Sequence, residues 1–222
     1  MMFTARVPTQ QDRMAEPTPI VFVVDDDISV RNSLEWLIRF EGWQAETFSS
    51  AQEFLARPRV IVPNCLVLDV SLPGISGLDL QKRIGDDRGE MPIIFITGHG
   101  DIPTTVRAMK AGAIEFLTKP FADDLLRETI RHALERSRIA LVKLADRRQL
   151  EERYRTLSGR EQQVMALVVR GVLNKQVAGE LGITETTVKK HRGRVMEKMK
   201  AQSLADLVEM AARLDLRSAA RA

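Results

Sequence analysis

The sequence of 222 residues predicts an α/β domain built on a doubly wound, parallel, five-stranded sheet, followed by a small all-α domain of four helices. Short apolar runs alternate with helix-sized segments over residues 20–121, as in parallel sheets that are covered on both faces. From residue 157 onward, glycines separate four short helical segments. Lys and Arg number 15 against 20 Asp and Glu over residues 1–136, and 18 against 10 over residues 137–222. The basic second part suits a polyanionic partner.

Composition limits the class of protein. No apolar run approaches the roughly 18–20 residues that a membrane-spanning helix needs. Residues 1–18 are polar and lack the apolar core of a signal peptide, so we expect a disordered tail, with Met14 as an alternative natural start. The single Cys65 allows no internal disulfide and predicts a buried thiol in a reducing cytoplasm. We therefore expect a cytoplasmic protein without a membrane partner.

Five short runs of mostly apolar residues predict the strands of the sheet. They are residues 20–24, 44–48, 65–68, 93–97 and 114–118. Helix-sized segments lie between them, such as 29–40, in which Leu34 and Ile38 recur at helical spacing. A doubly wound sheet of this kind binds ligands at the carboxyl ends of its strands.

Reactive side chains follow four of the predicted strands. Asp25–Asp27 come after the first strand and Asp69 after the third, while Thr97 ends the fourth and Lys119 follows the fifth. We expect these side chains to meet in one crevice, where several carboxylates need a cation. Oxygen ligands without nearby His or Cys favour Mg²⁺ or Mn²⁺ over zinc. A carboxylate beside such a cation, a lysine and a hydroxyl can attack a phosphoryl group.

The motifs VVDDD, LDVSLPGISGLDL, IIFITGHGDI and FLTKPF resemble the receiver domain of bacterial response regulators, especially the FixJ-type subgroup, over about 120 residues. The resemblance implies that Asp69 is the phosphoacceptor. It also implies that Mg²⁺ is held by Asp25, Asp26, Asp69 and the backbone carbonyl of Ser71, and it favours Asp26 over Asp25 as the direct ligand of the acidic pair.

The same resemblance implies a conformational switch. Thr97 is then the hydroxyl that moves to the phosphoryl oxygens, Lys119 is their cationic partner, and Phe116 is the aromatic residue that rotates. The lysine reaches the crevice through the Lys119–Pro120 bond, which we expect to be cis. Leu72 stands where relatives more often carry Met, without affecting this chemistry.

Simpler roles are open to some of these residues. Asp25–Asp27 could cap the helix that begins near Ser29, and Lys119 could be a solvated surface lysine. His99 lies on the loop after Thr97 with no acidic partner evident, and we interpret it as a residue that tunes dephosphorylation rather than an acid–base catalyst.

Two other classes of protein share features with the first domain. A haloacid-dehalogenase-type phosphatase also forms an aspartyl-phosphate, but that class needs a second Asp two residues after the nucleophile, at the first strand. Here Asp69 precedes Val70 and Ser71 at the third strand, so we expect the chain not to be an enzyme. A small-molecule sensor would have no use for the complete set of acids, Thr97 and Lys119.

Residues 122–157 contain no Gly or Pro and predict a long helix, with a coiled coil left open. The expected organisation is a disordered tail at 1–18, a receiver domain at 19–136, a helical linker at 137–156 and a helical domain at 157–217.

Four helices are predicted in the last domain. They are residues 159–170, capped by Ser158; residues 175–181, capped by Asn174; residues 185–199, capped by Thr184; and residues 203–214. A short helix, a tight turn at Gly182 and a second capped helix form a helix-turn-helix plan. The helix at 185–199 has one apolar face with Val188 and Val195, and an opposite basic face that can enter the major groove of DNA.

The segments LSGREQQV, NKQVAGELGI and TVKKHRGRVMEKM resemble the LuxR/NarL-type helix-turn-helix. The resemblance places Lys189 and Lys190 at base contacts, and phosphate contacts at Asn174, Lys175, Thr186 and Thr187. Arg194 shares the basic face. Gly193 departs from relatives that carry a contacting side chain, which suggests close approach to DNA. Arg192 lies nearer the core edge, where we expect it to pair with Glu161.

Both resemblances together imply a phosphorylation-controlled regulator of transcription. A sensor histidine kinase phosphorylates Asp69, which favours a homodimer through the face of the fourth helix, at about 103–111, and the fifth strand. The dimer then binds double-stranded DNA through paired last helices, with RNA polymerase as a further partner. A small helical protein-interaction module is the alternative for the last domain.

Overall fold

The computed structural model describes residues 17–85, 90–98 and 101–216. The expectations for most of the N-terminal tail, for the start at Met14 and for His99 lie outside the described residues. The chain divides into two compact units, residues 1–141 and 142–222. Among the described residues, no helix combines the length and the apolar character needed to cross a bilayer.

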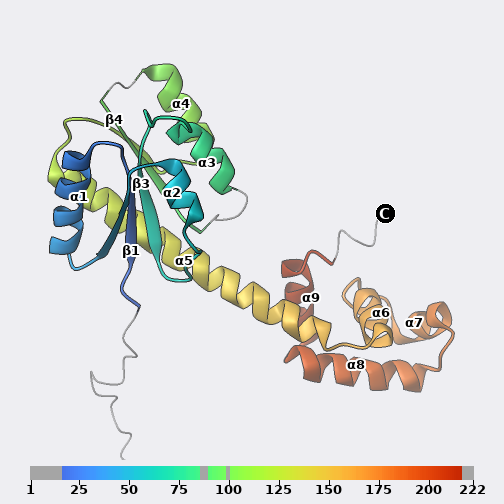
Figure 1. Cartoon of the computed structure of the whole chain (residues 1–222). Helices are drawn as coiled ribbons and strands as arrows, with labels where there is room; N and C mark the ends of the chain where they lie inside the picture. Colours follow the sequence, from blue (N-terminus) through green and yellow to red (C-terminus); the bar gives the residue numbers. More distant parts are fainter. Residues whose placement is uncertain (1–16, 86–89, 99–100, 217–222) are drawn as a thin grey trace, which may run out of the picture. The chain divides into compact units, whose positions relative to one another are not determined.

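The first unit contains the predicted five-stranded sheet, and all of its strands are parallel (Figure 1). The strands are β1 (Ile20–Val24), β2 (Gln44–Phe48), β3 (Asn64–Asp69), β4 (Ile93–Thr97) and β5 (Glu115–Thr118), in the spatial order β2-β1-β3-β4-β5. The order reverses beside β1, so the carboxyl ends of β1 and β3 border the crevice where such sheets bind ligands. The predicted doubly wound sheet is thus confirmed.

Helices cover both faces of this sheet (Figure 1). The helices of the first unit are α1 (Ile28–Phe40), α2 (Ala51–Ala56), α3 (Gly77–Gly85), α4 (Ile102–Lys110) and the start of α5 (Asp123–Arg155). Alternate residues of β1 face opposite sides, as the two-residue period of a strand requires. Val21 and Val23 pack with α1 and α5, whereas Phe22 and Val24 pack with α2, α3 and α4.

Helix α5 packs on the sheet beyond the boundary expected at residue 136. The Ser137 side chain is buried, and its hydroxyl accepts a hydrogen bond from the backbone N–H of Asn64 at 3.0 Å. Asn64 also extends β3 by one residue before the predicted apolar run. Cys65 on β3 is fully buried as predicted, and burial raises the pKa of its thiol.

The second unit is an all-α domain, as predicted. It contains the end of α5 and four further helices: α6 (Gly159–Val168), α7 (Asn174–Leu181), α8 (Glu185–Met199) and α9 (Leu204–Arg213). Val164, Val177 and Val195 belong to a single core cluster that also includes Leu150 at the end of α5. Gly182 ends α7 with the left-handed backbone (φ +64°) that favours glycine at this position.

Two predicted caps were confirmed and one was wrong. Ser158 caps α6 and Thr184 caps α8 through their side-chain oxygens. The residue before α7 is Leu173 rather than Asn174, which instead begins the helix. The Gln176 side chain reaches back to accept a hydrogen bond from the Leu173 N–H at 3.1 Å, so a polar cap residue is not required there.

Candidate phosphorylation site and DNA-binding surface

Strand ends bring Asp25, Asp69 and Lys119 together at the carboxyl edge of the sheet. The Lys119 ammonium donates to Asp25 Oδ2 at 2.6 Å and to Asp69 Oδ1 at 3.1 Å. Asp25 is only 1% exposed and Asp69 is also buried, while Lys119 is half-buried. The Lys119–Pro120 bond is cis, as predicted. A solvated surface role for Lys119 is therefore wrong.

The protonation of this cluster depends on burial and on mutual contact. Burial raises the pKa of Asp25, although the hydrogen bond from Lys119 acts in the opposite direction. For Lys119, burial lowers the pKa, but hydrogen bonds to Asp25 and Asp69 outweigh it and the pKa is raised overall. Lys119 is therefore held as a cation between two carboxyl groups.

Backbone groups hold the acidic residues in place. Asp69 Oδ2 accepts a hydrogen bond from the Ser71 N–H at 2.7 Å, and Asp25 Oδ1 accepts one from the Asp27 N–H at 2.9 Å. Asp27 itself caps α1 by accepting from the Ser29 N–H at 2.7 Å. The capping interpretation therefore holds for Asp27, whereas Asp25 points to Lys119.

Two residues near the site were not singled out from the sequence. The Arg31 guanidinium donates from Nη1 to the backbone carbonyls of Asp25 at 2.7 Å and Asp26 at 3.0 Å. A Cβ atom at Gly77 would lie 2.3 Å from the backbone carbonyl oxygen of Asp69, so only glycine fits beside the third strand. Gly77 lies within the LPGISGLDL motif, whereas Arg31 gave no sequence signal beyond its place at the start of a helix.

The predicted switch residues border the same edge. Thr97 ends β4 and is fully buried, and its backbone carbonyl accepts a hydrogen bond from the Lys119 N–H at 2.7 Å. Phe116 on β5 is half-buried, with its ring tilted against that of Phe95 at a centroid distance of 6.2 Å. The roles of Thr97 and Phe116 in a switch stay a prediction.

The oxygen-rich site fits a hard divalent cation by its chemistry. No group of three or more His, Cys, Asp or Glu residues among those described is already gathered as a metal-binding cluster. Mg²⁺, however, usually takes only one or two carboxylates and keeps several waters. Asp25 and Asp69 share one ammonium, and exposed Asp26 directly follows Asp25 in the sequence. One ammonium does not neutralise both carboxylates, so their charge favours binding of a further cation.

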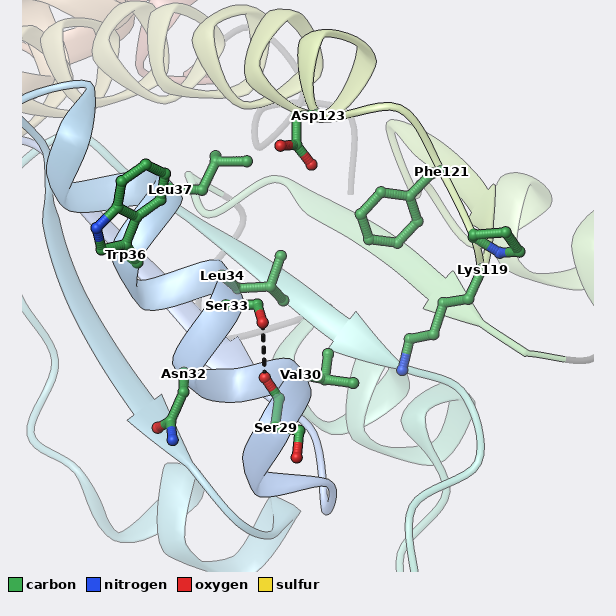
Figure 2. Close-up of a pocket in the computed structure, with 11 residues that line it drawn as sticks. Ser29, Val30, Asn32, Ser33, Leu34, Trp36, Leu37, Lys119, Phe121 and Asp123 are labelled. Carbon is green, nitrogen blue, oxygen red and sulfur yellow. Dashed lines mark hydrogen bonds between the residues drawn. The ribbon is translucent and has the colours of Figure 1, made fainter.

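A groove of about 710 Å³ borders this site between α1 and the segment that follows β5. Its mostly apolar lining includes Leu34, Leu37 and Phe121, and Lys119 contributes to one end (Figure 2). Trp36 also lines the groove, is 68% exposed and stacks on Phe40, with ring centroids 5.4 Å apart. A partner protein approaching Asp69 past this groove would meet exposed aromatic surface.

In the second unit, α8 has the two faces that the sequence predicts. Val188, Val195 and Met199 are buried, and the basic residues Lys189, Lys190 and Arg194 are exposed. Lys189 lies 3.6 Å from the Glu185 carboxylate one turn earlier, a weak surface ion pair. The exposed face is therefore available to a polyanion, with Lys190 and Arg194 at its centre.

The four predicted phosphate-contact residues differ in their surroundings. Lys175 and Thr186 are exposed, whereas Thr187 is half-buried and its hydroxyl is 2.8 Å from that of Thr184 at the helix cap. Asn174 is also half-buried, and its side-chain oxygen accepts a hydrogen bond from Arg192 Nη1 at 2.7 Å. Lys175 and Thr186 thus have the most accessible side chains of the set.

The predicted pair between Arg192 and Glu161 was wrong. Glu161 is 2% exposed and instead accepts from Lys198 Nζ at 2.6 Å and from the Ser158 N–H at 2.8 Å. Hydrogen bonds from Lys198 and Ser158 lower the pKa of Glu161 to about 2. Lys198 lies nearer the end of α8 and therefore reaches the start of α6, which leaves Arg192 for α7.

Comparisons with known proteins match both parts of the chain. Residues 21–131 match the family model described as the response regulator receiver domain, and residues 155–211 match that of bacterial regulatory proteins of the luxR family. Nodulation protein W of Bradyrhizobium diazoefficiens is 52% identical, with 91% of this chain and 89% of that protein covered. Transcriptional regulatory protein FixJ of Rhizobium meliloti is 43% identical, with 86% and 94% covered. The solved response regulator StyR is 49% identical, with 88% and 99% covered and a TM-score of 0.76.

Proposed function

This chain belongs to the response regulators that join a receiver domain to a LuxR-type DNA-binding domain and regulate transcription, and we propose that phosphorylation of Asp69 controls its binding to duplex DNA. One observation carries this proposal: Lys119 bridges Asp25 and Asp69 at the carboxyl edge of the sheet. Formation of an aspartyl-phosphate needs a carboxylate nucleophile and cationic groups around the phosphoryl oxygens.

The phosphodonor in this proposal is a phosphohistidine on a partner histidine kinase. An oxygen of Asp69 attacks phosphorus, and the new O–P bond forms as the P–N bond breaks. The departing imidazole nitrogen keeps the electron pair and takes a proton from solvent. Lys119, 3.1 Å from Asp69 Oδ1, then donates to a phosphoryl oxygen. Mg²⁺ held by Asp25, Asp26, Asp69 and the Ser71 carbonyl would neutralise charge on the same group.

The groove beside Lys119 supports a protein as the phosphodonor. Asp69 is buried, so a donor reaches it only by approaching the mouth of the crevice. α1 borders that mouth and exposes Trp36 and Ile28, and exposed apolar surface of this kind marks protein interaction sites. We expect the kinase to contact this surface during transfer.

Dimerisation is the proposed link between phosphorylation and DNA. In this proposal, Thr97 moves toward the phosphoryl group, Phe116 rotates after it, and the surface of α4 and β5 changes. The exposed apolar residues of α4 support this surface as the contact: Ile102 is 81% exposed, and Val106 and Met109 are also exposed. Dimers would bring two copies of α8 to successive turns of the DNA, where RNA polymerase is a further proposed partner.

Phosphorylation of the purified chain tests the first step. A small phosphodonor with Mg²⁺ should label wild-type protein, and Asp69→Asn or chelation by EDTA should each abolish labelling. Mapping of the phosphate by mass spectrometry should find Asp69. A phosphate on Asp25, Asp26 or a serine of the wild-type chain would contradict the assignment.

Sedimentation with and without beryllofluoride, a mimic of the phosphoryl group, tests the dimer step. It should show more dimer with the mimic, and an unchanged distribution would refute that step.

A further inference from the structure

Gly193 lies in the middle of α8 although neither the backbone nor the packing requires glycine there. It is not among the glycines with a positive φ, and it lies within a continuous helix. Apart from its two chain neighbours and the adjacent backbone of α8 itself, a Cβ added at Gly193 would meet no atom of the described residues within 4 Å. Glycine is among the least favourable residues in a helix interior, so the position lowers helix stability without a compensating contact from the part of the chain that the structure describes.

The position of Gly193 is on the basic face of α8. This face has four exposed positions at spacings of four, three and four residues: Thr186, Lys190, Gly193 and Glu197. Residues at such spacings form one row along a helix. Gly193 is therefore a gap in that row, one turn beyond Lys190 and adjacent in sequence to Arg194.

We propose that the missing side chain at Gly193 sets how deeply α8 enters the major groove, so that Lys190 and Arg194 on either side reach the DNA. This inference rests on the proposed DNA binding through α8. An α-helix with its side chains is about 10–12 Å wide, and the major groove is about 12 Å wide. The fit leaves little spare width, so one additional carbon on the facing side forces the helix outward.

A different account makes Gly193 merely a position that has lost a DNA contact. In that account, alanine would be harmless or helpful, because it pre-organises the helix without displacing anything. Close approach has the opposite consequence: alanine stabilises the free protein but weakens its complex with DNA. Gly179 provides the matched control, since it lies inside α7, is exposed, and has no described atom within 4 Å of an added Cβ.

The test compares Gly193→Ala, Gly193→Leu and Gly179→Ala in the full chain, on a duplex selected in vitro for binding to the phosphorylated wild-type protein. Both alanine variants should raise the melting temperature of the second unit by about 4–8 °C. Gly193→Ala should weaken DNA binding at least about five-fold, and Gly193→Leu more. Gly179→Ala should change binding less than about two-fold.

Four outcomes would overturn the inference. The first three are unchanged or tighter binding by Gly193→Ala, an equal loss in Gly179→Ala, and a lower melting temperature in Gly193→Ala, which would assign the glycine to folding. A loss that does not grow from alanine to leucine would also exclude a steric gap. Lys190→Ala is measured alongside: if it too binds normally, DNA recognition through α8 fails, whereas a loss in Lys190→Ala alone refutes only the role of Gly193.

Discussion

Lys119 is the residue on which the proposed chemistry of the first unit depends. It is the ammonium between Asp25 and Asp69, and both carboxyl groups are buried. Without it, two acidic groups would face each other and a phosphoryl group would lose a nearby donor. In our account, Lys119 therefore separates the two carboxyl groups before phosphorylation and donates to the phosphoryl group after it.

Lys119→Met should leave a folded chain that is phosphorylated about 100- to 1,000-fold more slowly, since removal of one preorganised donor typically has that effect. The rate of labelling by a small phosphodonor with Mg²⁺ measures this directly. Lys82→Met is the matched control, because Lys82 lies on the surface of α3 and pairs only with Asp79 among the interactions described. Equal rates for Lys119→Met and wild type would show that the ammonium is not needed.

At the scale of elements, hydrophobic periodicity predicted strands and helices well where burial alone decides them. β1, β2, β4 and α8 have the expected bounds, since their apolar residues match the periods of a strand or a helix. The edges of β3 differ because Asn64 and Asp69 are polar residues that burial and hydrogen bonding draw into the strand. A search for apolar runs could not predict that these two polar residues belong to the strand.

Side-chain partners between helices were harder to predict than the helices themselves. Glu161 can be reached from several positions on α8, and sequence periodicity does not rank flexible cations by reach. The structure selects Lys198 for Glu161 and Arg192 for Asn174. Similarly, asparagine is a favoured cap residue, yet Asn174 begins α7, and its side chain accepts a hydrogen bond from Arg192.

The pair of Glu161 and Lys198 should make the second unit sensitive to acid. The pKa of Glu161 falls from 4.5 to about 2 on folding, so its contribution is complete above about pH 4.5 and is lost as the pH falls toward 2. Glu161→Gln should destabilise the unit by about 1–3 kcal/mol at pH 7 and flatten this dependence.

Urea unfolding of the second unit between pH 7 and pH 2.5 would measure both effects. Glu209→Gln is the control, because Glu209 is an exposed residue of α9. If Glu161→Gln kept the same stability as wild type at pH 7 and the same slope below pH 4.5, the ion pair would have no role in stability.

Contacts of α7 and α8 with DNA should divide into two energetic classes. Lys189→Ala or Lys190→Ala should cost about 1–3 kcal/mol on the selected duplex and relax discrimination at particular base pairs. Lys175→Ala should weaken selected and scrambled duplexes alike and reduce the salt slope by about one unit, as loss of a phosphate contact does. Salt titrations on both duplexes separate these cases. Equal losses on both for Lys189→Ala and Lys190→Ala would make them backbone contacts and move base reading to Arg194.

On the scale of the whole molecule, the division of charge matches the division of roles. The acidic first part of the sequence contains the proposed phosphorylation site, and the basic second part contains α8. Composition and motif order predicted this organisation. They could not predict where the first unit ends, because α5 is one continuous helix, and buried Ser137 bonds to Asn64 of the sheet beyond residue 136.

The affinity of the full chain for its selected duplex, measured with and without beryllofluoride and Mg²⁺, tests the central claim most directly. Beryllofluoride mimics the phosphoryl group on an aspartate, so it isolates the effect of that group from the kinase. Wild-type protein should bind about 5- to 150-fold more tightly with the mimic, the usual range for coupling between two sites. Asp69→Asn should bind equally in both conditions. Equal affinity of the wild-type chain with and without the mimic, or a full response in Asp69→Asn, would contradict control of DNA binding through Asp69.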